Sequence, residues 1–112
     1  MTDCLFCKMV SGAIKPDVVF EDNDVLAFRD INPQAPVHIL VIPKDHIATL
    51  NELTDTQLAG KLLQTAVELA EKEGLSEAGY RTVFNCNKQG GQEVYHLHLH
   101  LLGGRQMTWP PG

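Results

Sequence analysis

Alternating apolar and polar positions predict five short strands in this 112-residue chain. Residues 17–30, DVVFEDNDVLAFRD, read as two strands around the turn residues 22–24, and residues 37–43, VHILVIP, form a nearly continuous apolar strand. Two further strands are predicted at 80–86, YRTVFNC, and at 94–102, VYHLHLHLL. Short connections between such strands favour an antiparallel sheet.

Two helices accompany these strands. Residues 4–12, CLFCKMVSG, predict a short N-terminal helix that stops at Gly12, and a longer helix begins near Thr54 and Gln57, which have capping-box spacing, and ends at Gly74. Its predicted apolar stripe comprises Leu58, Leu62, Leu63, Ala66, Val67 and Ala70. The expected fold is therefore α+β, with a five-stranded antiparallel meander sheet, one long helix and one short helix.

Length and charge narrow the class of protein. The size and the 44% hydrophobic content are typical of a single domain, here residues 1–112. A formal net charge of −5 gives no basic field to attract nucleic acid or an anionic membrane. The N-terminal residues MTDCLFCKMV lack a cationic segment followed by a long apolar one, so we expect a cytoplasmic protein that inserts into no membrane.

Histidines occupy alternate positions, 96, 98 and 100, in the last predicted strand. Alternation places the three imidazoles on one face of the sheet and leucines on the other. Same-face neighbours are about 6.6 to 6.8 Å apart, so one metal ion could bind two of these histidines but not all three. A solvated sheet face is the plainer reading for one histidine, whereas three in alternation indicate a site.

The loop before these histidines contains Gly90, Gly91 and Gln92, where exposed backbone amides could receive phosphate oxygens. A neutral imidazole is a competent nucleophile at pH 7, because the ordinary histidine pKa is about 6.5. A backbone carbonyl or a second histidine would have to fix its tautomer. No Walker pattern is present, so the chain is not a P-loop enzyme.

Residues 92–105, QEVYHLHLHLLGGR, resemble the signature of the histidine triad family. Residues 28–47, FRDINPQAPVHILVIPKDHI, and 105–112, RQMTWPPG, are similar to its Hint branch, so the resemblance covers nearly the whole chain. It implies a purine nucleoside phosphoramidase that hydrolyses the P–N bond of adenosine 5′-phosphoramidates, and acyl-adenylates, through a covalent nucleotidyl-histidine. The implied ligands are purine nucleotides (AMP, GMP) and phosphoramidate substrates.

The resemblance also implies residue roles. His98 matches the nucleophile, His100 a phosphate-binding residue, His38 a further active-site histidine and His96 a residue that supports them from behind. The implied nucleotide contacts are Phe28 at the base, Asp30 at the ribose, Ile31, and on the phosphate side Asn85, Gly91, Gln92, Glu93, His98 and His100. Glu93 departs from the serine of many Hint relatives: a hydroxyl there could donate to the leaving amine, whereas a carboxylate would have to accept or act after protonation.

Family precedent further implies a structural zinc ion bound by Cys4, Cys7, His46 and His96, with no cofactor needed for catalysis. A free thiol pair is the alternative for the two cysteines. The family also implies a homodimer that joins two sheets into one, with the tail 104–112 reaching the partner and Trp109 near the leaving-group pocket.

Two other functions stay open from the sequence. A metal-dependent enzyme could hold a catalytic ion between two of the alternating histidines, and a non-catalytic module could bind nucleotides or a protein partner. Assay with an adenosine phosphoramidate in the presence of a chelator would separate these possibilities from a metal-free hydrolase.

Overall fold

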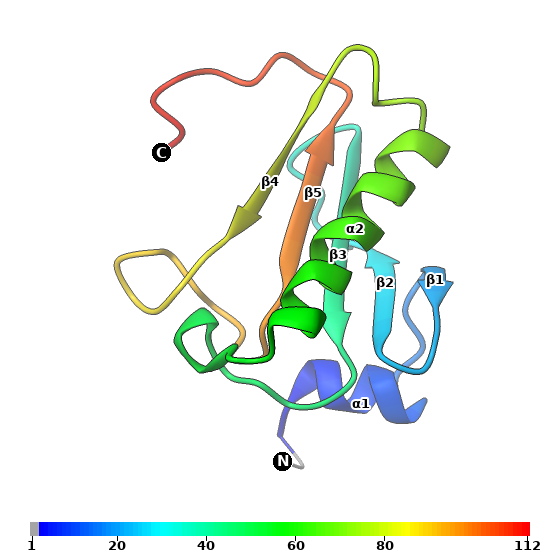
Figure 1. Cartoon of the computed structure of the whole chain (residues 1–112), viewed down its shortest axis with the longest axis vertical. Helices are drawn as coiled ribbons and strands as arrows, with labels where there is room; N and C mark the ends of the chain where they lie inside the picture. Colours follow the sequence, from blue (N-terminus) through cyan, green and yellow to red (C-terminus); the bar gives the residue numbers. More distant parts are fainter. Residues whose placement is uncertain (1–2) are drawn as a thin grey trace.

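The computed structural model describes residues 3–112 and consists of one sheet with helices on both sides (Figure 1). In chain order the elements are α1 (Leu5–Ser11), β1 (Val18–Glu21), β2 (Val25–Arg29), β3 (Val37–Pro43), the 3-10 helix η1 (Leu50–Glu52), α2 (Thr56–Lys72), β4 (Tyr80–Phe84) and β5 (Leu99–Gly103). The α+β class, the five strands and the two α-helices are confirmed. No helix of the described chain is long and apolar enough to span a membrane.

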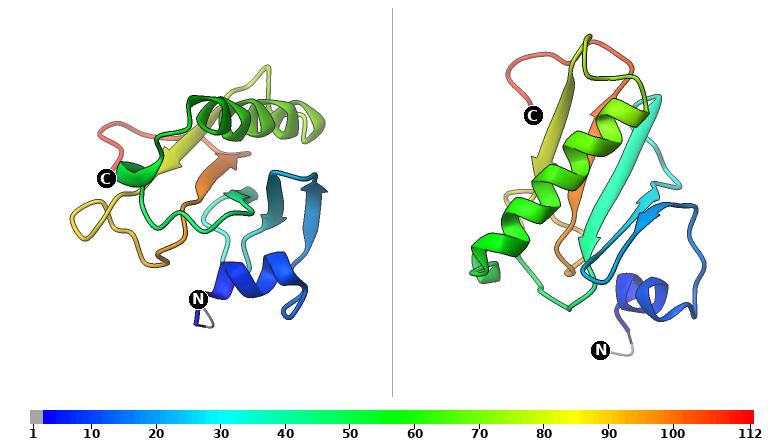
Figure 2. Two further views of the ribbon diagram at one scale, coloured as in Figure 1. Left: turned by 60° about the horizontal axis from the view of Figure 1, so that its bottom comes forward. Right: turned by 45° about the vertical axis from the view of Figure 1, so that its right-hand side comes forward.

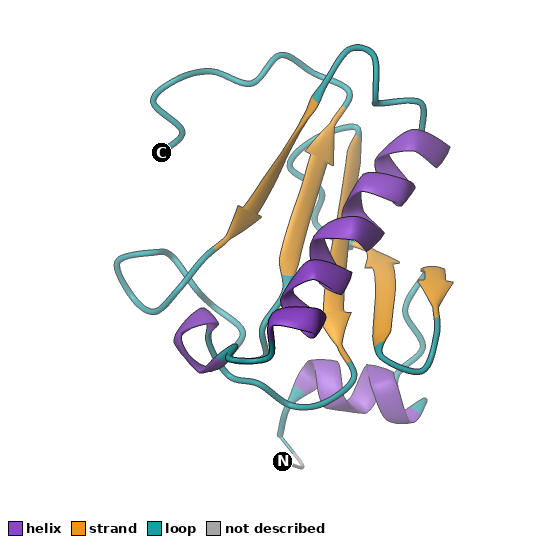
Figure 3. Cartoon of the chain, viewed as in Figure 1, coloured by secondary structure: helices purple, strands orange, loops and turns teal. Residues whose placement is uncertain are grey.

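The five strands pair antiparallel in the order β1-β2-β3-β5-β4. This order departs from a strict meander at one point, because α2 carries the chain across the sheet and delivers β4 to the far edge (Figure 3). The last strand then fills the place between β3 and β4, where His100 pairs with Leu40 on one side and Val83 on the other. β5 is therefore an interior strand held from both sides.

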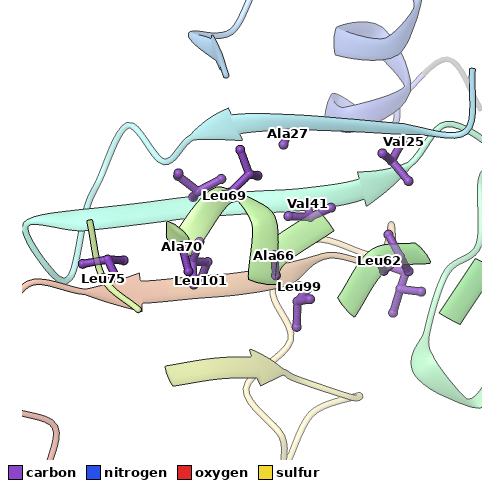
Figure 4. Packing of buried hydrophobic residues seen from close by; sticks show 12 residues of the cluster. Val25, Ala27, Val41, Leu62, Ala66, Leu69, Ala70, Leu75, Leu99 and Leu101 are labelled. Atoms are coloured by element: carbon purple, nitrogen blue, oxygen red, sulfur yellow. The ribbon is translucent and has the colours of Figure 1, made fainter. Parts of the chain in front are cut away.

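The two faces of the sheet bury separate apolar clusters, as strand alternation requires. α2 covers one face and α1 lies on the other (Figure 2). The α2-side cluster, much of it drawn in Figure 4, comprises Val25, Ala27, Ile39, Val41, Leu62, Ala66, Leu69, Ala70, Leu75, Leu97, Leu99 and Leu101. The second cluster comprises Phe6, Leu26, Phe28, Leu40 and Ile42. The triad histidines share the α1 side.

Three details of the predicted elements are wrong. The N-cap of α2 is Asp55 rather than Thr54, and its carboxylate accepts hydrogen bonds from the amides of Gln57 and Leu58. In the predicted apolar stripe, Leu63 and Val67 are exposed because they lie on the side of the helix turned away from the sheet. The last strand starts at Leu99 rather than residue 94, because the chain before it pairs with the loop after β3 instead, the Leu97 amide donating to the Ile47 carbonyl.

Candidate active site

A cavity of about 510 Å³ opens on the α1 side of the sheet. Its lining comes from α1 and the loop after it, from β2 and β3 with their connection, from the loop between β4 and β5, and from the histidines. His38, His98 and His100 all line it, whereas His96 lies behind them, fully buried. Three histidines of the sequence prediction thus meet in one cavity and the fourth supports it.

His98 has one ring nitrogen fixed by the main chain. Its Nδ1 lies 2.7 Å from the carbonyl oxygen of His96, a distance at which Nδ1–H donates to the carbonyl. The neutral ring therefore carries its proton on Nδ1 and keeps a lone pair on Nε2. Because His98 lines the cavity while only 9% exposed, that lone pair is available to a molecule bound in the cavity, and most of the ring is shielded from solvent.

His38 and His100 form a second, connected pair. The amide of Gln34 donates to Nδ1 of His38 over 3.0 Å, and Nε2 of His38 lies 2.9 Å from Nδ1 of His100. Since His38 accepts at Nδ1, it holds its proton on Nε2 and donates it to His100, which then carries its own proton on Nε2. Within residues 3–112 that His100 Nε2 is buried and has no hydrogen-bond partner. It is an N–H donor without an acceptor, on a ring that lines the cavity.

Burial keeps these imidazoles neutral. It lowers the pKa of His38, His96 and His98 below the ordinary 6.5, and the Asp30 carboxylate only partly opposes the effect at His38 and His98. For His100, burial and then the neighbouring rings of His98 and His38 lower the pKa to about 4. At neutral pH the site therefore offers one imidazole lone pair and one imidazole N–H.

Most of the predicted nucleotide contacts gather around the same cavity. Its lining includes Phe28, Asp30, Ile31, Asn85, Gly91 and Glu93. Gln92 is not among the lining residues: it is buried in the loop, where its amide donates to the carbonyls of Ala48 and Val94 and its oxygen accepts from the Asn87 amide. Gln92 thus shapes the loop that carries Gly91 and Glu93.

The sequence prediction missed the contribution of α1. Leu5, Phe6 and Met9 of this helix line the cavity, and Phe6 packs edge-on against His98 with ring centroids 5.2 Å apart. The apolar residues of CLFCKMV predict a helix with a buried side, but no spacing in the chain indicates which face of the sheet it covers. The two cysteines on either side of Phe6 connect α1 to the far end of the chain through their contacts with His96.

Cys4 and Cys7 meet His46 and His96 behind the triad. Cys4 Sγ lies 3.4 Å from Nδ1 of His96, and Cys7 Sγ lies 3.3 Å from Nδ1 of His46 and 3.5 Å from Nδ1 of His96. All four candidate ligand atoms lie within 4.8 Å of one another. Nε2 of His96 donates to the Pro43 carbonyl over 2.8 Å, so its Nδ1 lone pair faces the sulfurs.

This donor set fits zinc. Two sulfurs and two imidazole nitrogens are a tetrahedral zinc set, and bond lengths of about 2.3 and 2.0 Å place neighbouring sulfur and nitrogen ligands roughly 3.5 Å apart. The observed sulfur–nitrogen contacts of 3.3 to 3.5 Å already have that spacing. A tautomer that leaves Nδ1 free is also the one that a metal ligand requires.

The fold and the row of imidazoles define a histidine triad domain. The model of the HIT domain family matches residues 11–107, and the chain belongs to that family. The purine nucleoside phosphoramidase of Escherichia coli K12 is 48% identical over 107 residues, covering 94% of this chain and 90% of that protein. A protein of Arabidopsis thaliana named adenylylsulfatase HINT1 is 54% identical, covering 96% of this chain and 76% of its own.

Solved structures agree with this assignment. A HIT family hydrolase from Legionella pneumophila superposes with a TM-score of 0.95 at 64% identity, covering 98% of this chain and all of that one. A histidine triad protein from Clostridium difficile gives a TM-score of 0.92 at 41% identity, with 96% of each chain covered. A relative from Brassica juncea, 53% identical over 98% of this chain, is named a 14 kDa zinc-binding protein.

Proposed function

We propose that this chain is a purine nucleoside phosphoramidase, a hydrolase that cleaves the P–N bond of adenosine 5′-phosphoramidates and also accepts acyl-adenylates. The observation that carries the proposal is the Nε2 lone pair of His98 next to the ring of His100, whose centroid is 4.9 Å away and whose Nε2–H has no hydrogen-bond partner among residues 3–112. A nucleophile and an N–H donor side by side are what substitution at a phosphate needs. The names of the Escherichia coli and Arabidopsis relatives support hydrolysis at such a phosphorus.

In the first step Nε2 of His98 attacks the α-phosphorus and forms a P–N bond to the ring. The bond from phosphorus to the substrate's amine nitrogen breaks, its electron pair leaves with that nitrogen, and the amine takes up a proton from water in the open cavity. His100 donates its Nε2–H to a phosphoryl oxygen, where negative charge accumulates. The His96 carbonyl stabilises the positive ring of the adduct through Nδ1–H.

In the second step water attacks phosphorus and the bond to Nε2 breaks, returning its electron pair to His98. The products are a nucleoside 5′-monophosphate, AMP or GMP, and a proton given to solvent. Four residues that line the cavity are assigned to its two ends: Glu93 to the amine side, and Phe28, Asp30 and Ile31 to the nucleoside side, with the Asp30 carboxylate proposed to bind the ribose hydroxyls. The two steps replace one difficult displacement by two easier ones.

A catalytic metal ion is the second candidate, because Asp30, His38 and His100 also place possible ligand atoms within 4.8 Å of one another. The hydrogen bonds argue against it. A metal at Nε2 of His38 would have to displace the proton there, while the Gln34 amide already occupies the lone pair on Nδ1. With a metal on Nε2, the neutral His38 ring would carry its proton on Nδ1 and could no longer accept the hydrogen bond from the Gln34 amide. The observed hydrogen bonds therefore favour His38 as a donor to His100 rather than as a metal ligand.

We further propose that Cys4, Cys7, His46 and His96 bind a structural zinc ion. Four protein ligands leave no open position for substrate, so the ion would fix the N-terminal helix to the triad segment and supply no chemistry to the reaction. The support is the sulfur and nitrogen donor set and its spacing.

We also propose that the protein is a homodimer. Leu63 and Val67 present apolar side chains to solvent on α2, which packs on β3 and β5, and β4 is the edge strand beside β5. A two-fold contact there would bury both and continue the sheet. In the tail, the Thr108 carbonyl accepts a hydrogen bond from Arg81 of β4, and Trp109 is 82% exposed, so that a partner could contact it.

One experiment separates the candidate functions. Adenosine 5′-phosphoramidate is incubated with the protein and with His98→Ala, each with and without a chelator, and the reaction is quenched for intact-protein mass measurement. The proposal requires that the wild type releases AMP, also shortly after chelator is added, and that its mass increases by one covalently attached AMP group. His98→Ala should release no AMP and form no adduct. Immediate loss of activity with chelator would favour the metal-dependent enzyme instead, and no turnover at all would favour a binding module.

A further inference from the structure

The N-terminal helix depends on its surroundings. α1 has seven residues, whereas isolated helices shorter than about 12 to 15 residues are marginal in water. Its buried residue is Phe6, which is 4% exposed and packs in the cluster of Leu26, Phe28, Leu40 and Ile42. Met9 and Val10 pack against the same cluster, and the sulfur contacts of Cys4 and Cys7 add attachments on either side of Phe6.

Phe6 connects these attachments to the nucleophile. Its ring meets that of His98 at 5.2 Å between centroids and 87° between planes, and that of His96 at 5.9 Å and 70°. Both are edge-to-face contacts, which are favourable and orientation-dependent. Phe28 also contacts Phe6, with ring centroids 5.4 Å apart. One aromatic side chain thus lies between the cysteine–histidine cluster and the reacting ring.

We propose that Phe6 is a positioning residue for His98, and that the cluster of Cys4, Cys7, His46 and His96 sets the rate of nucleotidyl transfer through it. This inference rests on His98 being the nucleophile. Within its own segment the His98 ring is held by a single hydrogen bond at Nδ1, about which it can still tilt. The edge-to-face contact with Phe6 restricts that tilt and keeps the Nε2 lone pair aimed into the cavity.

The cluster acts on Phe6 because it fixes the helix from both sides of that residue. Cys4 is the N-cap of α1, and its sulfur also accepts a hydrogen bond from the Cys7 amide over 3.2 Å. If the ligands separate, the first turn of a short helix loses its anchor and Phe6 becomes free to withdraw. Misplacement of a reacting group by about 1 Å can cost roughly a hundredfold in rate.

The test compares Phe6→Leu with Val10→Ala. Val10 is in the same helix and packs against the same apolar cluster, but it does not line the cavity. We expect Phe6→Leu to slow adduct formation in single turnovers by about tenfold or more, with the affinity for AMP changed far less. Val10→Ala should lower the melting temperature without slowing adduct formation.

A second readout follows the His98 ring directly. The Nδ1–H that donates to His96 should give a proton NMR signal protected from exchange with water, and Phe6→Leu should accelerate its exchange. Zinc-chelator treatment should accelerate this exchange in the wild type and have little additional effect in Phe6→Leu, because both changes release the same contact.

The outcomes are distinguishable. Equal slowing by Phe6→Leu and Val10→Ala, or an unchanged Nδ1–H exchange rate in Phe6→Leu, overturns the positioning role. An exchange rate that responds to chelator equally in both proteins overturns the coupling through Phe6. If His98→Ala forms the adduct as fast as the wild type, the proposed nucleophile itself is wrong, whatever Phe6→Leu does.

Discussion

The Nδ1 atom of His98 lies 2.7 Å from the carbonyl oxygen of His96, two residues earlier in the chain. A main-chain group thus determines which nitrogen of His98 carries the proton. The same carbonyl can stabilise the positive ring that exists while a nucleotidyl group is attached to Nε2. Substitution of His98 should therefore remove chemistry and leave the surrounding site in place.

His98→Gly is expected to reduce turnover of adenosine 5′-phosphoramidate by about a thousandfold or more, since no other side chain supplies the attacking nitrogen. Affinity for AMP should remain largely intact, because base and ribose contacts are unchanged. Steady-state kinetics and calorimetric titration with AMP measure the two effects. Wild-type kcat in this variant would contradict the covalent route.

His38→Phe should lower kcat by roughly ten- to a hundredfold, because His100 then loses the donor at Nδ1 that keeps its own proton on Nε2. Nitrogen NMR of labelled histidine gives an independent readout. We expect His100 to be the Nε2–H tautomer in the wild type and a mixture of tautomers in His38→Phe. An unchanged tautomer would mean that the cavity, rather than His38, determines it.

Acid should destabilise the protein through its buried histidines. His100 has a folded-state pKa of about 4 against the ordinary 6.5, so between these values the unfolded chain binds a proton that the folded protein does not. The free energy of unfolding should therefore be level above pH 6.5 and fall as pH is lowered toward 4. His38 contributes in the same direction, because burial lowers its pKa as well.

Thermal unfolding at several pH values measures this slope. His100→Asn, although less stable at neutral pH, should lose less of its remaining stability on acidification than the wild type. Equal slopes for the two proteins would show that His100 is not the group responsible.

Chelation should lower the melting temperature, and Cys4→Ser should lower it similarly, because each removes part of a closed ligand set that ties α1 to the triad segment. Metal analysis of protein purified without added zinc should find about one equivalent per chain. Cys86→Ser, which changes a cysteine outside the cluster, is the control. Zinc well under one equivalent, with Cys4→Ser as stable as the wild type, would leave the cysteines as plain thiols.

Val67→Glu should convert the proposed dimer into monomers, since it puts a charge into the apolar surface of α2. Sedimentation at micromolar concentration checks this, and a wild-type monomer there would refute the dimer.

Truncation after Gln106 should change the preference among leaving groups more than the melting temperature, because Trp109 is exposed and packs into no core.

The parts of the structure that depend on strand alternation and on the histidine motif were predictable from the sequence. Alternation in DVVFEDNDVLAFRD and VHILVIP placed β1, β2 and β3, and the HLHLH pattern placed His98 and His100 on the cavity side. The insertion of β5 between β3 and β4 was not predictable, because strand order depends on how α2 crosses the sheet. Two element boundaries differ from the prediction for local reasons. Asp55, rather than Thr54, caps α2, and the hydrogen bond between Leu97 and Ile47 shortens the last strand.

The role of α1 shows a different limit. Its helical pattern was readable, but its placement results from contacts between residues about 90 positions apart, such as Cys4 with His96. Only the family resemblance connected those positions in advance. Gln92 illustrates the reverse case, because a residue assigned to the phosphate side is buried with its amide bound to the loop.

Three of the four imidazoles around the site are oriented by peptide groups: His98 by the His96 carbonyl, His96 by the Pro43 carbonyl, and His38 by the Gln34 amide. A peptide carbonyl is present whatever amino acid occupies a position, and a peptide N–H is present at every residue except proline. Replacing the Gln34 side chain by any other than proline therefore does not by itself move a proton in the site. An evolving lineage can thus vary the cavity walls, and with them the choice of substrate, while the protonation pattern of the reacting rings is inherited with the backbone.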